Sequence, residues 1–190
     1  MTTHVISWSG GPDSTYGLLQ FLRDTADPVV AVCVGAAVDS RYVRAFMRAT
    51  RRLETPLRER TRDFRVVRYG ITAENTVAEP SDEVTVLAMV TAMSYDDAIL
   101  YWFCCAEDDQ PSAWPVRNEA LVERQTNLMK GVVTEKNLNR EVGKGTIRKA
   151  LGDLWDLTWS CLHPSDALEP CRRCEKCRER RRAELLARTA

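Results

Sequence analysis

The residue types best suited to chemistry lie in two short stretches, one near each end of the chain. The first, Ser9–Thr15, reads Ser-Gly-Gly-Pro-Asp-Ser-Thr and stands between a short apolar stretch and residues with helical spacing. A glycine-rich turn that leads into a helix directs backbone N–H groups and the positive end of the helix dipole at one point, which suits a phosphate. The alternative is a glycine turn capped by Ser14 or Asp13, in any α/β protein.

The second stretch holds four of the seven cysteines. Cys161 precedes Cys171, Cys174 and Cys177, which are spaced three residues apart. Four thiolates at this spacing predict a closed tetrahedral Zn²⁺ site, which is structural because metal binding adds folding free energy to a segment with little apolar surface. An iron–sulfur cluster is the alternative, but the nearby basic residues and the absence of a ferredoxin-like pattern favour zinc. His163 is a possible substitute ligand, although four cysteines suffice.

The composition describes a chain with a sizeable core and no overall charge. Its 190 residues predict one domain, and the 44% of hydrophobic residues are enough for a core. The 27 basic and 27 acidic residues cancel, so we expect neither a nucleic-acid nor a membrane partner, although arginines cluster over Arg178–Arg182.

The sequence also predicts the cellular compartment in which the protein is found. No apolar run approaches the ~20 residues needed to span a bilayer, and the first residues lack the basic and apolar regions of a signal peptide. We therefore expect a cytoplasmic protein, in which cysteines are metal ligands or buried thiols rather than disulfides. Cys33, Cys104 and Cys105 lie in apolar runs, where cysteine behaves as a small hydrophobe.

Strand-like and helix-like stretches alternate along the chain. Short apolar runs predict buried strands at His4–Trp8, Val29–Val34, Phe64–Tyr69 and Ala98–Cys104. Helical spacing predicts helices from Tyr16, over Arg41–Leu53, over Glu83–Met93, from about Val116 to Met129, and over a short segment after Lys144. This alternation predicts an α/β fold, a doubly wound parallel sheet with right-handed crossovers.

In such a sheet, ligands bind past the carboxyl ends of the strands, so three loops matter. These are Ser9–Thr15, Gly35–Ser40 and Ala106–Pro115, while polar Thr72–Asp82 is expected to be a further loop. In the third, Asp108 and Asp109 could hold Mg²⁺ or accept hydrogen bonds from a base, and Trp114 could stack on a planar ring. The alternative is an exposed acidic turn that Trp114 pins to the core.

Two further features of the sequence are basic. Lys144 is flanked by glycines just before a short helix, where its charge opposes the helix dipole. That placement makes sense if an anion binds beside it, and the alternative is a surface lysine. The five arginines of Arg41–Leu53 are interpreted as a solvated helix face.

The Ser9–Thr15 motif resembles the PP-loop of the N-type ATP pyrophosphatases, which split ATP between the α and β phosphates and adenylate a substrate. It is not a Walker A loop, because no Gly-Lys-Ser/Thr follows. Three later segments extend the resemblance to the 7-cyano-7-deazaguanine synthase family over most of the chain. They are Lys144–Ile147, the Thr-Trp-Ser-Cys run of Thr158–Cys161, and Cys171–Arg178.

The resemblance implies a reaction. 7-Carboxy-7-deazaguanine is adenylated on its carboxylate by ATP, ammonia displaces AMP to give an amide, and a second adenylation with loss of water gives the nitrile. It also implies a doubly wound PP-loop domain over residues 1–157, with a zinc-binding segment over 158–190 packed on it, and a homodimer. The residues that would hold ATP and pyrophosphate are Trp8, Ser9, Gly10, Gly11, Pro12, Asp13, Ser14 and Thr15.

The resemblance also assigns roles to single residues, both within this set and elsewhere in the chain. Asp13 would help to place Mg²⁺, Ser14 would contribute a hydroxyl to catalysis, and Lys144 would neutralise phosphate charge. Asp108, Asp109 and Trp114 stand on the substrate side. Zn²⁺ on Cys161, Cys171, Cys174 and Cys177 would order the C-terminal segment against the mouth of the active site.

The sequence departs from the family pattern on the substrate side. Gly35–Ser40 replaces an Asp-Tyr-Gly-Gln-like segment, and Pro80–Glu83 replaces a Pro-Gly-Arg-Asn step, so that an arginine and an amide have become two acids. A second hypothesis is therefore a PP-loop adenylating enzyme for another carboxylate, a tRNA base or a protein terminus. A third is a non-catalytic nucleotide-binding module whose zinc segment binds a partner.

Overall fold

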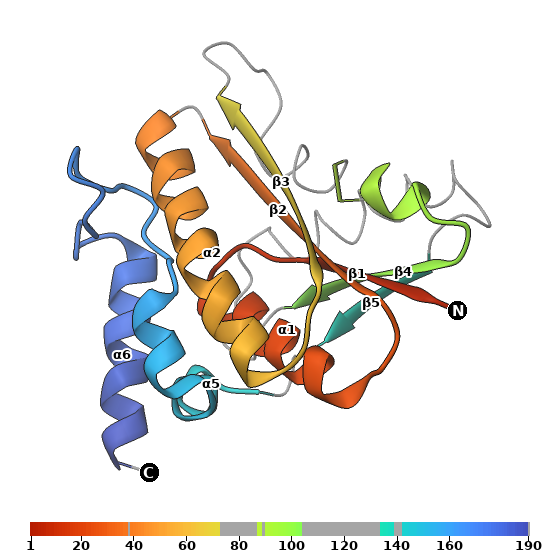
Figure 1. The fold of residues 1–190 in the computed structure, drawn as a ribbon. Coiled ribbons are helices and arrows are strands. Elements are labelled where there is room, and N and C mark those ends of the chain that lie inside the picture. Colours follow the sequence, from red (N-terminus) through yellow and green to blue (C-terminus); the bar gives the residue numbers. More distant parts are fainter. Residues whose placement is uncertain (38, 73–86, 89, 104–133, 139–141, 190) are drawn as a thin grey trace.

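A computed structural model describes residues 1–37, 39–72, 87–88, 90–103, 134–138 and 142–189. Its centre is a sheet of five parallel strands in the order β3-β2-β1-β4-β5 (Figure 1). The strands are β1 (Thr3–Ser7), β2 (Val29–Ala37), β3 (Arg65–Thr72), β4 (Ala98–Phe103) and β5 (Thr134–Leu138). The prediction of an α/β fold with a parallel sheet is confirmed.

The apolar runs form strands because they bury side chains on both faces of the sheet. In β1, Ile6 packs into one core cluster and Val5 into the other. In β2, Ala31 and Cys33 face the side of Ile6, whereas the neighbouring valines face the side of Val5. This two-sided burial is the reason that these strands show continuous apolar runs rather than alternation.

Helices cover the face of the sheet that contains Ile6. They are α1 (Pro12–Asp24), α2 (Ser40–Arg60), α5 (Lys144–Leu151), the 3₁₀ helix η2 (Gly152–Leu157) and α6 (Glu175–Thr189). The helical residues between 87 and 93 pack on the opposite face, where Ala88 and Ala92 join the cluster of Val5. Helices therefore lie on both faces of the sheet, as predicted.

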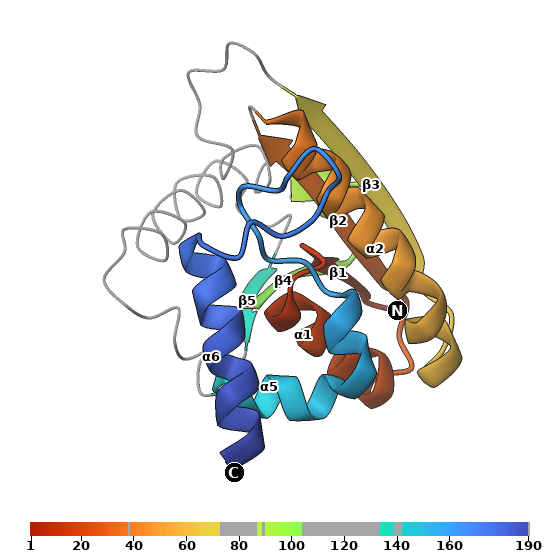
Figure 2. The ribbon, with the colours of Figure 1, turned by 90° about the vertical axis from the view of Figure 1, so that its left-hand side faces the viewer.

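The C-terminal segment returns to the middle of the molecule. After η2, the chain passes between α2 and the start of α6 and lies in front of the beginning of α1 (Figure 2). Among the described helices, none is both long enough and apolar enough to cross a bilayer.

Several predicted boundaries were wrong. Gly35 to Ala37 continue β2 instead of starting a loop, because they pair in register with β3 from Gly70 to Thr72. Helix α1 begins at Pro12, four residues before the predicted start, since proline is well suited to the first helical position. Helix α2 continues past Leu53 to Arg60, with Pro56 inside it.

Strand β5, the 3₁₀ helix η2 and helix α6 had no counterpart in the sequence interpretation. Strand β5 is the polar run Thr-Glu-Lys-Asn-Leu, which pairs with β4 at the edge of the sheet. Helix α6 is highly charged and follows the last cysteines. The predicted helix over Val116–Met129 lies outside the described residues, as do the 106–115 loop, Cys104 and Cys105, and residues 73–82 of the predicted polar loop.

Candidate functional site

The Ser9–Thr15 loop lies at the carboxyl end of β1, the central strand of the sheet. Helix α1 starts at Pro12 with Gly11 as its N-cap, and its first backbone hydrogen bond runs from the Thr15 N–H to the Gly11 carbonyl over 3.0 Å. The backbone N–H groups of Asp13 and Ser14 come before this first helical hydrogen bond, so they point out of the amino end of the helix. This arrangement directs N–H donors at the space above the loop, as an anion site requires.

The two serine hydroxyls close the loop on itself. Ser9 Oγ lies 2.9 Å from Ser14 Oγ, and the Ser9 N–H donates to Ser14 Oγ over 3.1 Å. Ser9 Oγ also accepts from the Gly11 N–H at 3.3 Å. These bonds hold the loop in a fixed shape, so its donors are arranged before a ligand arrives, which is how oxyanion-binding sites gain their strength.

Trp8, which precedes the motif, and Thr15, its last residue, are both buried. Trp8 is fully buried, and its indole N–H donates to Thr15 Oγ1 over 3.1 Å. The Trp8 ring also meets Phe64 edge-on, with 6.2 Å between the ring centroids. Trp8 and Thr15 therefore support the loop from beneath, whereas Asp13, which is half-buried in the first helical turn, remains near the amino end of the helix.

Glycine is required at the tip of the loop. Gly10 has a φ of +65°, and a Cβ atom there would lie 2.9 Å from Thr50 Cγ2 of α2. At Gly11 a Cβ atom would lie 3.1 Å from Ser9 Oγ and 3.5 Å from the Trp159 carbonyl oxygen. The loop is thus packed between α2 and the C-terminal segment, and larger residues would push it out of shape.

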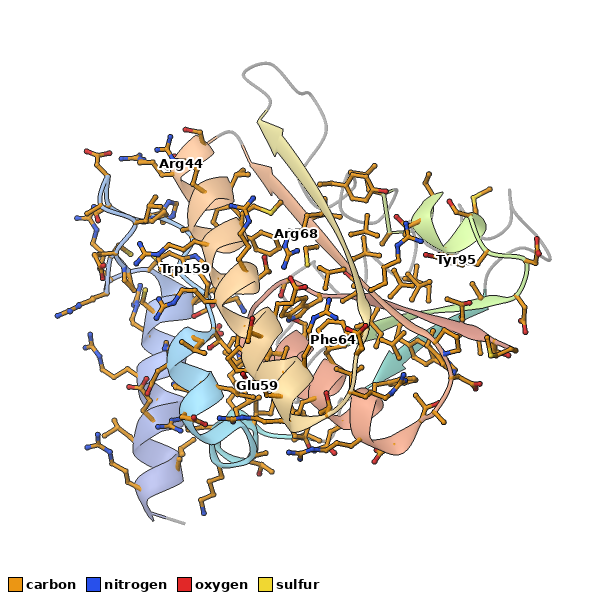
Figure 3. The ribbon with its side chains drawn as sticks, in the orientation of Figure 1. Arg44, Glu59, Phe64, Arg68, Tyr95 and Trp159 are labelled. Carbon is orange, nitrogen blue, oxygen red and sulfur yellow. The ribbon has the colours of Figure 1, made fainter. Side chains whose placement is uncertain are left out.

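The C-terminal segment is hydrogen-bonded to the loop. The Trp159 N–H donates to the Gly10 carbonyl over 2.9 Å, and the Trp159 indole N–H donates to the Cys161 carbonyl over 2.9 Å. Figure 3 shows Trp159 between α2 and the C-terminal segment. One residue thus connects the Ser9–Thr15 loop to the first cysteine of the cluster.

A mostly buried arginine holds this connection in place. The Arg180 guanidinium of α6 donates to the Thr158 carbonyl and hydroxyl at 3.2 and 2.8 Å, and to the Trp155 carbonyl at 2.6 Å. It also lies over the Trp155 ring, 4.7 Å from its centroid. Burial lowers the pKa of Arg180. Its three bonds fix the backbone immediately before Trp159.

The four C-terminal cysteines converge. Their Sγ atoms all lie within 4.8 Å of one another, and those of Cys171 and Cys177 are 4.0 Å apart. The four residues are Cys161, Cys171, Cys174 and Cys177. A tetrahedral Zn²⁺ with Zn–S bonds of about 2.3 Å places its sulfurs about 3.8 Å from one another. The cluster therefore fits such an ion, which confirms that the four predicted residues could hold a metal.

The surroundings of the cysteines shift the pKa values of their thiols in different directions. Backbone N–H groups of Arg173 and Cys174 lower the pKa of Cys171 to about 6, and burial raises the pKa of Cys161 and of Cys177. Cys171 Sγ accepts from the Cys174 N–H over 3.3 Å, and Cys161 Sγ accepts from the Cys171 N–H over 3.2 Å. Such N–H···S bonds orient the sulfurs, as outer-shell bonds do around metal ligands.

Lys144 occupies a different setting from the one expected. It is buried at the start of α5, where its Nζ atom donates to Glu179 Oε2 of α6 over 2.5 Å. Lys176 contacts the same carboxylate at 3.1 Å. The Glu179 carboxylate thus offsets the charge that Lys144 brings to a helix amino end, and this ion pair ties α5 to α6.

The substrate side is only partly described. Asp108, Asp109 and Trp114 lie outside the described residues. In the Gly35–Ser40 segment, Asp39 is the N-cap of α2 and accepts from the Arg41 N–H over 2.8 Å. Arg41 also pairs with Asp166 of the C-terminal segment at 3.0 Å. Asp39 therefore has a structural role here.

Sequence interpretation missed two residues that matter to this site. The Thr-Trp-Ser-Cys run was recognised as a motif, but nothing in it indicated that the Trp159 N–H would bond to Gly10. Arg180 was grouped with the basic residues of the tail, although it is mostly buried. Its proximity to Cys177, one helical turn earlier, is the only local signal that it faces inward.

Comparisons with known proteins add no relative. No protein-family model matches the chain, and no curated protein matches it significantly.

Proposed function

We propose that this chain is an ATP-dependent adenylating enzyme of the PP-loop type, and that it converts 7-carboxy-7-deazaguanine and ammonia into 7-cyano-7-deazaguanine. The single observation that carries the proposal is the Ser9–Thr15 loop. It combines a left-handed Gly10, the amino end of α1 and two mutually bonded serines at the carboxyl end of the central strand. That combination suits the polyphosphate of a nucleotide.

The chemistry that the loop must assist is the departure of pyrophosphate. A carboxylate oxygen attacks the α-phosphorus of ATP, the bond to the β-phosphate breaks, and an acyl adenylate forms. Ammonia then displaces AMP, which leaves with that oxygen, and an amide remains. A second ATP takes the amide oxygen in the same way, and loss of AMP and protons gives the nitrile.

Negative charge develops on pyrophosphate in both adenylation steps. Helix N–H donors at Asp13 and Ser14 would stabilise that charge without reorganising, because the loop is already fixed by its internal bonds. Mg²⁺ held by Asp13 would neutralise the phosphate oxygens further. Because Lys144 pairs with Glu179, we infer that it acts on phosphate only by exchanging partners.

The cysteine cluster has a supporting role in this proposal. Cys161, Cys171, Cys174 and Cys177 would hold Zn²⁺ as a closed structural site. Through Trp159, the site would keep the C-terminal segment against the tip of the loop. The proposal therefore assigns the metal a positioning role and gives it no step in the reaction.

A second candidate function follows from the altered substrate side. Pro80–Glu83 carries two acids where the resembling family has an arginine and an amide, and Asp39 is committed to the cap of α2. These changes fall on the substrate side, so they bear on which acceptor the site recognises rather than on the ATP chemistry. The alternative is an adenylating enzyme with a different acceptor, such as another carboxylate, a tRNA base or a protein terminus.

Product analysis by mass spectrometry tests the proposal. Zinc-loaded protein is mixed with Mg·ATP, ammonium and 7-carboxy-7-deazaguanine, and the expected products are the nitrile and AMP. Folded protein that binds ATP but makes no nitrile would favour the second candidate, and other acceptors would then be screened for AMP release.

A pair of variants on α1 tests the role of the loop. Asp13→Asn is expected to lower AMP formation by about 100-fold, the loss typical when a group that stabilises a developing charge is removed. Asp24→Asn makes the same change at the exposed opposite end of the same helix and should leave AMP formation unchanged. Equal rates in the two variants would contradict the assignment.

A further inference from the structure

A basic groove runs between α2 and the C-terminal segment. It encloses a cavity of about 200 Å³ whose walls include Arg48 and Arg52 from α2 and Arg180 from α6. Residues Thr158–Cys161 form part of its lining, and Ala49, which lies against Gly10, forms another part. The groove therefore adjoins the Ser9–Thr15 loop without being part of it.

The arginines of α2 form a row along this groove. Arg48 and Arg52 are four residues apart, so they lie on one face of the helix about 6 Å apart along its axis. Both are exposed, and within the described part of the chain neither forms an ion pair. Arg44 continues the row by one more turn, near the start of α2 (Figure 3).

The opposite wall carries a fixed positive charge. Arg180 is held by the Thr158 and Trp155 carbonyls, so its guanidinium keeps its place whether or not a ligand is bound. Two carboxylates, Asp156 and Glu169, also line the cavity, and both are exposed. Arg180 also pairs with Glu184 at 3.5 Å, so the positive charge that a ligand could meet comes mainly from Arg48 and Arg52 of α2.

The surroundings extend the positive charge. Helix α2 contains seven arginines and two glutamates. The cysteine segment and the first half of α6 add five exposed arginines, which are Arg172, Arg173, Arg178, Arg181 and Arg182. The net charge of zero therefore hides an uneven distribution, with basic residues gathered on two adjacent elements.

We propose that this groove binds the phosphodiester backbone of a nucleic acid. Arginine recognises phosphate with paired N–H donors, and a row of arginines about 12 Å long on α2 fits an anion with repeated charges better than a single phosphate. The contacts are to the backbone, so binding should be independent of sequence. This proposal replaces the expectation that the net charge alone gave, and it does not depend on the proposed ATP chemistry.

Fluorescence anisotropy tests the proposal without ATP. The probes are labelled single-stranded RNA, single-stranded DNA and duplex DNA of one mixed sequence, titrated with the zinc-loaded protein between 50 and 200 mM salt. Binding should weaken linearly with the logarithm of salt concentration. Preference for one probe would identify the kind of nucleic acid, and binding of any of them supports the proposal.

Two double variants with equal charge separate the groove from general basicity. Arg48→Gln with Arg52→Gln removes two groove arginines, and should lower affinity at 50 mM salt by about tenfold and reduce the salt slope by about 2. Arg23→Gln with Arg188→Gln removes two exposed arginines elsewhere and should change neither. Thermal unfolding at equal midpoints would show that both variants are folded.

Two results would overturn the proposal. One is the absence of binding to all three probes at 50 mM salt. The other is an equal loss of affinity in both double variants, which would mean that net charge rather than the groove governs binding. Because no ATP is present in these titrations, either result would leave the proposed adenylation untouched.

Discussion

At the scale of single residues, the Ser9–Thr15 loop is shaped by contacts on every side. Ser9 and Ser14 bond to each other, Trp8 holds Thr15 from below, and Trp159 holds Gly10 from above. None of these bonds needs a ligand. The loop is therefore preorganised, and substitutions that disturb its shape should affect nucleotide binding as well as stability.

Gly10 provides the sharpest test at this scale. Gly10→Ala forces an L-residue to a φ of +65° and places its methyl group 2.9 Å from Thr50 Cγ2. We expect a loss of about 1–3 kcal/mol in the free energy of unfolding. We also expect at least about a tenfold loss of ATP affinity, because hydrogen bonds to charged groups contribute about 1.5–3 kcal/mol each.

Gly152→Ala is the matched control for that substitution. Gly152 also has a positive φ, +56°, but a Cβ atom there would meet no heavy atom within 4 Å. This variant should lose stability through backbone strain alone and keep its ATP affinity, measured by isothermal titration calorimetry. Unchanged ATP affinity in Gly10→Ala would contradict the role given to the loop.

At the scale of elements, the C-terminal segment and the loop behave as one unit. The Trp159 N–H and indole join Gly10 to Cys161, and Arg180 of α6 fixes the preceding backbone. Release of the metal should free Cys161, and this should loosen the hydrogen bond from the Trp159 N–H to the Gly10 carbonyl. The metal site should thus influence a nucleotide that it does not touch.

Removal of zinc with a chelator is therefore expected to lower ATP affinity about tenfold while the sheet remains folded. Alkylation followed by peptide mass spectrometry monitors the metal, since Cys161, Cys171, Cys174 and Cys177 should react only after its release. Cys33 is the internal control, because burial raises its pKa to about 12 and should protect it in both states. Unchanged ATP affinity in metal-free protein would refute the coupling.

The contact between α2 and β3 predicts a pH dependence of stability. Burial of Glu54 opposes its charge, but hydrogen bonds from Arg68 and Arg58 outweigh burial and lower its pKa. A lowered folded-state pKa means that stability is full above the ordinary glutamate value of about 4.3 and is lost as pH falls through the folded value. Denaturant titrations should show this loss, and Glu54→Gln should abolish part of it.

The same scale shows what sequence could and could not predict. The apolar run around Val5 and Ile6 predicted a strand buried on both faces, and Cys161 followed by three cysteines spaced three residues apart predicted that the four converge. Strand β5 was missed because its residues are polar and its position depends on pairing with β4. The sequence predicts that Lys144 contacts phosphate, and it did not reveal the ion pair with Glu179, because Glu179 lies on α6, an element that local patterns did not predict.

At the scale of the whole molecule, the parallel sheet brings distant segments to one place. The carboxyl end of β1, the amino end of α1, the middle of α2 and the cysteine cluster meet around Gly10. The loop and the basic groove lie on neighbouring sides of this junction. The molecule thus places a candidate nucleotide site beside a candidate site for a nucleic-acid backbone.

The central claim is that a carboxylate is activated by transfer of AMP. The most direct measurement uses 7-carboxy-7-deazaguanine labelled with ¹⁸O in both carboxylate oxygens, with ATP and ammonium. The account predicts two AMP molecules per nitrile, each carrying one ¹⁸O on phosphorus, because each oxygen leaves with an adenylyl group. Release of ADP and phosphate, or of AMP without the label, would contradict it.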